Sequence, residues 1–292
     1  MKLARVLGVT GRVMITAGVL ILLFVAYQLW GTGFQTARAQ DRLEDEFERE
    51  LEANAPEEPE ETAAGDEPGA QPELPALPPH GEGVGRIEIP AIGADWIFLE
   101  GVDLDTLKDG PGHYEGTPLP GEPGNAAIAG HRTTYGQPFH NLDNVGDGDR
   151  VRITYINGAQ YEYSYLGTEI VRPGDVHVIQ DRGDDRLTLT ACHPKYSARE
   201  RIVVSFALLD DPAPAGERPE AEEPVQLDLD GEEASTVPAF LWAGASGSIW
   251  LAAWVVGRVW RRWPAYLTGL PFFLAALFVF FENFSRLLPA NY

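Results

Sequence analysis

Hydrophobic residues follow two different patterns along this chain. Residues 13–30, 238–257 and 264–281 form three runs that are almost entirely apolar. About 18 or more such residues, rising about 1.5 Å each in a helix, span the roughly 30 Å hydrocarbon core of a bilayer. Between the runs, residues 81–209 contain short segments in which apolar and polar residues alternate, which is the period of a half-buried strand. The pattern predicts a β domain flanked by one N-terminal and two C-terminal transmembrane helices.

The alternating segments predict about eight short strands with few helices, typical of an all-β sandwich or closed barrel. The clearest of them lie at residues 85–90, 94–99, 125–130, 150–156, 160–171, 187–192 and 202–209, with one helical turn at 103–108. Asn157-Gly158 favours a tight turn with positive φ, so the strands on either side should form a hairpin. Residues 110–124, rich in Pro and Gly, are expected to form a long loop, and Phe139 and Leu142 should fill apolar space from a second loop.

Acidic residues are concentrated in two linkers. Residues 41–73 hold 14 acidic and 2 basic residues, and residues 210–233 hold 10 and 1. Repeated prolines follow residue 55, so we expect residues 31–80 to be an extended, self-repelling linker, with at most a short charged helix over 40–52, and residues 210–237 to be a second linker. A net charge of -22 also argues against nucleic-acid binding, which needs a basic surface.

Basic residues orient the predicted membrane helices. Residues 1–12 contain Lys2, Arg5 and Arg12, and residues 258–263 contain three arginines. Cytoplasmic loops carry an excess of such residues, so both segments are expected inside the cell, which leaves the domain at 81–209 and the tail at 282–292 outside. Two alternatives remain: a signal peptide cleaved near Ala37-Arg38-Ala39, and a C-terminal pair that lies in the interface instead of spanning.

Three residues at predicted strand ends carry the candidate chemistry. Cys192, the only cysteine, ends one strand, His131 follows another, and Arg201 begins a third. They are the nucleophile, proton carrier and oxyanion donor that acyl transfer by a thiol needs. The competing interpretation is that Cys192 is an ordinary small core residue. Two alternatives are less favoured. His193 could replace His131 as the proton carrier, but its side chain should point away from Cys192 because it is the next residue on the strand. Arg199 could replace Arg201, but it should lie in the loop before the strand.

These segments resemble the sortases, membrane-anchored cysteine transpeptidases of Gram-positive bacteria. The family has a TLxTC strand, a histidine after an Ala-Gly pair and an arginine on the next strand, and here these read TLTAC, AGHRTTYG and RERIVV. The resemblance covers residues 81–209 and is most similar to class E sortases of high-GC actinobacteria. Ala191 departs from it, because the family usually has threonine before the cysteine.

The resemblance implies a sortase β-barrel and a definite reaction. Cys192 would attack a C-terminal LAxTG-type or LPxTG-type sorting signal of a secreted protein between Thr and Gly, and the resulting thioester would pass to an amine of a peptidoglycan precursor. Thr190 and Tyr135 are expected near the substrate. No cofactor or metal site is indicated, although some sortases bind calcium through loop carboxylates. The alternatives are a pilin-polymerising sortase, disfavoured because residues 41–80 lack an Asp-Pro-aromatic lid motif, and a non-catalytic peptide-binding membrane adaptor.

Overall fold

The computed structural model describes residues 2–54, 74–214, 235–260, 262–285 and 287. The chain divides into two compact units. One contains Met1–Thr32 and Glu233–Asn291, and the other contains Gly33–Glu232. Each unit is described by itself below.

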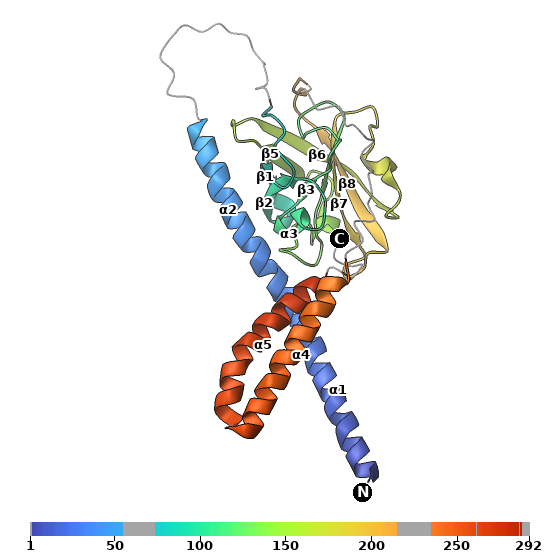
Figure 1. The fold of residues 1–292 in the computed structure, drawn as a ribbon. Coiled ribbons are helices and arrows are strands. Elements are labelled where there is room, and N and C mark those ends of the chain that lie inside the picture. The colour runs from blue at the N-terminus through green and yellow to red at the C-terminus, as the bar shows by residue number, and fades with distance from the viewer. Residues whose placement is uncertain (1, 55–73, 215–234, 261, 286, 288–292) are drawn as a thin grey trace. The chain divides into compact units, whose positions relative to one another are not determined.

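Eight strands of the described residues close into a barrel in the second unit (Figure 1), with the spatial order β1-β2-β3-β4-β7-β8-β6-β5. Their bounds are β1 Gly83–Ile89, β2 Ala94–Glu100, β3 Gly112–His113, β4 Asn125–Ala129, β5 Arg150–Thr154, β6 Gln160–Val171, β7 Arg186–His193 and β8 Glu200–Leu208. The closed barrel confirms the predicted all-β class, and β5 and β6 form the hairpin predicted around Asn157-Gly158. The prediction of a loop over 110–124 was wrong at β3, because a strand of two residues is too short to show a period.

Side chains of β7 alternate between two hydrophobic clusters. Leu187, Leu189 and Ala191 belong to the main core, together with Phe139 and Leu142, which confirms the expected role of the latter two. Thr188, Thr190 and Cys192 therefore point to the opposite face of the strand, because successive side chains alternate. A second cluster covers that face. It contains residues of α3 (Thr106–Asp109), of the 3-10 helix η4 (Val176–Ile179) and of the neighbouring strands. Its buried members are Leu107, Tyr114, Ala127, Ala129, Val178, Ile179 and Val203.

Helix α2 (Thr32–Ala53) corrects the prediction that residues 31–80 are an extended linker. Leu43 and Phe47 of this helix are buried against Ile97 and Leu99 of β2. Gln40 adds three hydrogen bonds through its side-chain amide, which accepts from the Ile97 amide and donates to the carbonyls of Ile97 and Asp109. The helix docks because its apolar residues recur every four positions and form one face, which outweighs the many charges around them. The remaining linker residues 55–73, and residues 215–234 of the second linker, lie outside the described part of the chain.

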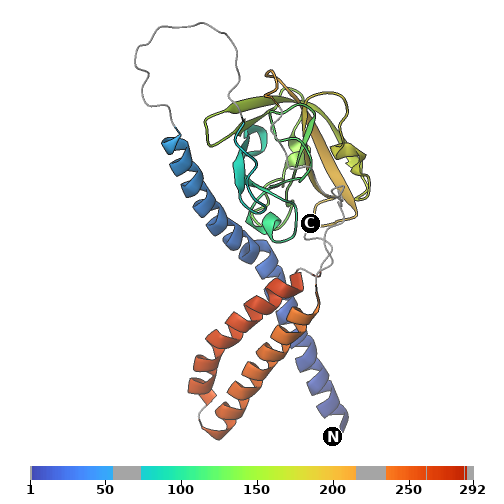
Figure 2. The same cartoon turned by 45° about the horizontal axis from the view of Figure 1, so that its top comes forward.

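The first unit is helical. Helix α1 (Lys2–Ala26) is followed by one π-helical turn η1 (Tyr27–Gly31), and α4 (Val237–Val259) and α5 (Arg262–Ser285) lie side by side as a hairpin (Figures 1 and 2). Three helices in the described residues are long and apolar enough to cross a membrane. Tyr27 and Phe24 pack edge-on against aromatic rings of α5, with ring centroids of Tyr27 and Phe278 5.1 Å apart and of Phe24 and Phe281 5.2 Å apart. Within the hairpin, Gly269 permits a close approach, because a Cβ there would lie 2.8 Å from Cβ of Ala253.

Candidate active site

Three neighbouring strands bring the candidate residues to one end of the barrel. In the antiparallel pair β7–β8, Cys192 lies opposite Arg201. In the parallel pair β4–β7, Ala129 lies opposite Thr190, and the Gly130 amide donates to the Thr190 carbonyl at 3.0 Å. His131 follows directly, so the topology places it beside Cys192 at the same end.

The three side chains also share the outer face of the barrel. Ala127 and Ala129 of β4 lie in the outer cluster, and His131 continues their alternation by two residues. On β8, Val203 belongs to the same outer cluster, and Arg201 lies two residues before it. Cys192 therefore lies outside the barrel interior, in a layer covered by loops and short helices.

Cys192 is a buried thiol, with 5% of its surface exposed. Burial raises the pKa of Cys192 above its ordinary value of 9.0, and the positive charges of Arg201 and Arg132 oppose the rise. A thiolate is the nucleophilic form, so a nearby cation stabilises the state that reacts. The resting residue is a neutral thiol whose ionisation two arginines favour.

His131 is even more enclosed, with 1% of its surface exposed. Burial, together with the smaller effect of the Lys108 charge, lowers the pKa of His131 from 6.5 to about 3. Its Nδ1 lies 3.4 Å from Oγ1 of Thr134, while its Nε2 is buried without a hydrogen-bond partner among the described residues. The ring of Tyr135 packs over the imidazole, with ring centroids 4.9 Å apart. The imidazole is thus neutral, held on one side, and has one nitrogen available to exchange a proton.

Arg201 is the second residue of β8 and is buried, with 6% of its surface exposed. Its Nη1 donates to the carbonyls of Ala198 at 3.1 Å and of Glu200 at 3.3 Å, which orients the guanidinium within the β7–β8 connection. Arg199 is exposed and precedes β8, so it lies away from this layer.

The two residues expected near the substrate have different surroundings. Tyr135 is buried against His131 and has a positive φ of 48°. Thr190 is buried two residues before Cys192 on the same face of β7, and its Oγ1 lies 3.1 Å from the hydroxyl of Tyr114. Burial raises the pKa of Tyr114 to about 12, so the phenol stays neutral.

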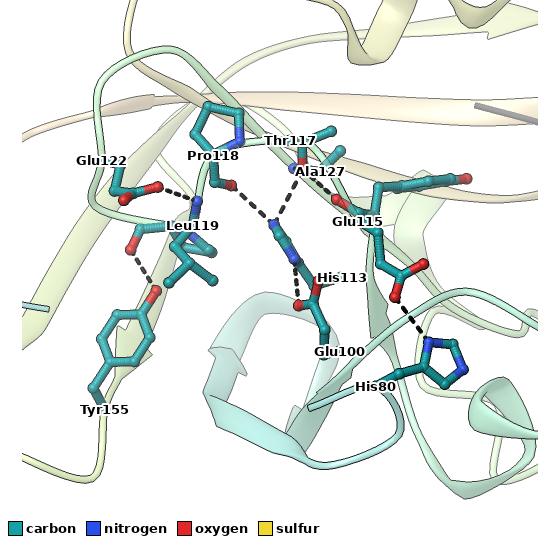
Figure 3. Close-up of polar contacts among 12 residues, drawn as sticks. His80, Glu100, His113, Glu115, Thr117, Pro118, Leu119, Glu122, Ala127 and Tyr155 are labelled. Atoms are coloured by element: carbon teal, nitrogen blue, oxygen red, sulfur yellow. Dashed lines mark hydrogen bonds and ion pairs between the residues drawn. The ribbon is translucent and has the colours of Figure 1, made fainter. Parts of the chain in front are cut away.

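A buried polar network supports the segment that carries Tyr114. Figure 3 shows His113 between Glu100 and Pro118: its Nδ1 lies 2.7 Å from a Glu100 carboxylate oxygen, and its Nε2 donates to the Pro118 carbonyl at 2.9 Å. His113 and Glu100 are both buried. His113 therefore helps to fix the loop beside the candidate site.

Three functional candidates were missed by sequence reasoning. Arg132, Lys108 and Tyr114 are all buried beside Cys192 or His131. The sequence offered a signal only for Arg132, which directly follows the singled-out histidine. Lys108 and Tyr114 come from segments that pack onto β4 and β7 from a distance, and no local pattern marks them.

Part of this chain is similar to known proteins. Residues 87–208 match the family model described as the sortase domain. These residues are a sortase domain. Sortase SrtE2 of Streptomyces coelicolor is 28% identical over 75% of this chain and 88% of its own length, and Sortase D of Bacillus subtilis is 34% identical over 40% of this chain and 58% of its own. A solved Sortase D5 transpeptidase of Clostridium perfringens aligns with a TM-score of 0.45 and 25% identity, covering 60% of this chain and 98% of that one.

Sortases are cysteine transpeptidases, so the chain is an enzyme of that class. Two curated relatives, SrtE1 and SrtE2 of Streptomyces coelicolor, match most of this chain, which supports the predicted similarity to class E sortases. The matched sortase domain contains Cys192, His131 and Arg201.

Proposed function

We propose that this sortase cleaves a C-terminal LAxTG-type or LPxTG-type signal between Thr and Gly and transfers the acyl group to an amine of a cell-wall precursor. The observation that carries the proposal is the shared outer face of Cys192, His131 and Arg201 at the ends of three adjacent strands. Acyl transfer needs a nucleophile, a proton carrier and an oxyanion donor, and in this proposal Cys192, His131 and Arg201 supply these three roles.

In the first half of the reaction, Sγ of Cys192 attacks the Thr carbonyl carbon while its proton passes to Nε2 of His131. Arg201 donates hydrogen bonds to the resulting oxyanion, because a guanidinium is always protonated and acts only as a donor. Collapse of the tetrahedral intermediate expels the glycine amine, which takes the proton from His131. The acyl group remains on Cys192 as a thioester.

In the second half, the acceptor amine attacks the thioester carbonyl and gives a proton to His131. The thiolate of Cys192 leaves and takes that proton from His131, so the enzyme returns to its starting state. Within the described part of the chain, Nε2 of His131 is buried and has no hydrogen-bond partner, which supports this role, since a neutral nitrogen without a competing partner accepts and returns a proton readily.

The test uses the full-length chain in detergent with LAxTG and LPxTG peptides, and with oligoglycine or hydroxylamine as acceptor. Mass spectrometry should show a new bond after Thr and an acyl adduct on Cys192. Cys192→Ala should form neither, and a peptide-binding adaptor would instead retain its function in that variant. Transfer only to a lysine side chain would point to pilin polymerisation in place of cell-wall attachment.

We further propose that the protein is a multi-pass membrane protein with its sortase domain outside the cell. The three apolar helices and the arginines at positions 258, 261 and 262 support this arrangement. In a Cys192→Ala background, Ser235→Cys should react with a membrane-impermeant maleimide on intact cells, whereas Val259→Cys should react only after permeabilisation. The opposite pattern would invert the topology.

A further inference from the structure

Arg132 reaches from the His131 loop to the end of β7. Only 1% of its side chain is exposed. Its Nη1 lies 3.1 Å from the carbonyl oxygen of Cys192 and 3.0 Å from Nδ1 of His193. A guanidinium has donors only, so Arg132 donates both bonds and Nδ1 of His193 accepts. The residue that directly follows His131 therefore contacts the end of the nucleophile strand.

The bond to the Cys192 carbonyl takes the place of a missing bond between strands. The parallel ladder of β4 and β7 ends where the Gly130 amide donates to the Thr190 carbonyl. Two residues further, the ladder would bring the Arg132 amide to the Cys192 carbonyl. Because β4 ends at Ala129, the side chain of Arg132 makes that bond instead. The backbone carbonyl of Cys192 is thereby hydrogen-bonded by the side chain of Arg132, the residue that follows His131.

The other end of the guanidinium is fixed to the loop that carries it. Nη2 of Arg132 lies 2.8 Å from Oδ1 of Asp143, and the Arg132 carbonyl accepts from Nδ1 of His140 at 2.8 Å. The Phe139 amide donates to the His131 carbonyl at 3.2 Å, which closes the loop on itself. The loop is thus held internally, and through Arg132 it is joined to the backbone of Cys192.

We propose that Arg132 is a positioning residue that holds the His131 loop and the Cys192 backbone at the separation needed for proton transfer. This inference rests on the proposed transpeptidase function. Arg132 acts through the Cys192 carbonyl and through its own loop, without a part in binding the sorting peptide. A misplacement of about 1 Å between reacting groups costs about 10²-fold in rate. Loss of the guanidinium fork should therefore lower kcat and leave KM almost unchanged.

The test compares Arg132→Lys, Asp143→Asn and the control Arg182→Lys in the full-length chain in detergent. Lysine keeps the charge but cannot span Cys192, His193 and Asp143 with one planar fork. Asp143 is partly exposed, so its isosteric replacement by Asn removes the negative charge and weakens the bond that holds the guanidinium to the loop, while preserving the fold. Arg182 is a surface residue paired with Glu169, and its replacement controls for the loss of a guanidinium. The measurements are kcat and KM for the donor peptide, the iodoacetamide alkylation rate of Cys192, and the melting temperature.

Arg132→Lys should lower kcat by about 10²-fold at a temperature where it is fully folded, with KM within about twofold of wild type. Asp143→Asn should lower kcat by a smaller factor, again with KM almost unchanged, and Arg182→Lys should match wild type. In Arg132→Lys and Asp143→Asn, Cys192 should still react with iodoacetamide. Wild-type kcat in folded Arg132→Lys overturns the inference; should Arg132→Lys not fold, wild-type kcat in Asp143→Asn overturns it. A failure of the wild-type chain to transfer any peptide counts instead against the proposed function.

Discussion

The burial of His131 predicts that acid will destabilise the sortase domain by a defined amount. The pKa of His131 falls from 6.5 to about 3 because burial removes water from the imidazolium and Lys108 repels it. Between these values the unfolded chain binds one more proton than the folded chain. Stability is therefore complete above the unfolded pKa and is lost as the pH falls toward the folded one.

The size of this loss of stability follows from the one extra proton that His131 binds in the unfolded chain. Each pH unit inside this window costs about 1.4 kcal/mol, so acidification from about pH 8 to about pH 5 should remove about 2 kcal/mol through His131 alone. The window extends well below pH 5, so a change of one unit in the folded pKa leaves this figure intact. His131→Gln and His131→Asn remove the titrating group and should not show this loss.

The single cysteine supplies the assay. Cys192 is buried when the domain is folded, so a brief pulse of a bulky maleimide labels unfolded molecules far faster than folded ones. Full-length wild type and both His131 variants are equilibrated in urea at each pH, pulsed and weighed. The stability difference between wild type and variant should change by about 2 kcal/mol between about pH 8 and about pH 5. Parallel pH curves for all three chains would refute the argument that His131 is buried and neutral.

Three further results are expected. Because burial raises the pKa of Cys192 above 9.0, its iodoacetamide rate should keep rising beyond that pH, and a plateau at lower pH would contradict the assignment. Phe47→Ala should cost about 3 kcal/mol in urea unfolding, because it empties the contact between α2 and the barrel, whereas Phe34→Ala on the exposed side should cost little; equal effects would argue against docking. Glu100→Gln should cost about 3 kcal/mol, because it replaces the buried carboxyl group that contacts Nδ1 of His113, and a loss near zero would argue against a stabilising role for this buried pair.

Sequence patterns predicted the parts of this protein that depend on neighbouring positions along the chain. The strands at 160–171 and 187–192 were recognisable because a period of two residues is a local property. The docking of α2 was missed, although Leu43 and Phe47 already stood four residues apart, because the surrounding carboxylates indicated a solvated segment. The two-residue strand β3 carries no pattern at all.

By itself, the sequence determined the strand segments, the three apolar spans and the resemblance that singled out Cys192, His131 and Arg201. Only the tertiary structure decided that β4 and β8 flank β7, that the three side chains lie on its outer face, and that Arg132 reaches the Cys192 carbonyl 60 positions away. The physical reason is that strand pairing and desolvation are non-local. The pKa of His131 depends on the layer of loops packed over it, and no sequence period describes that layer.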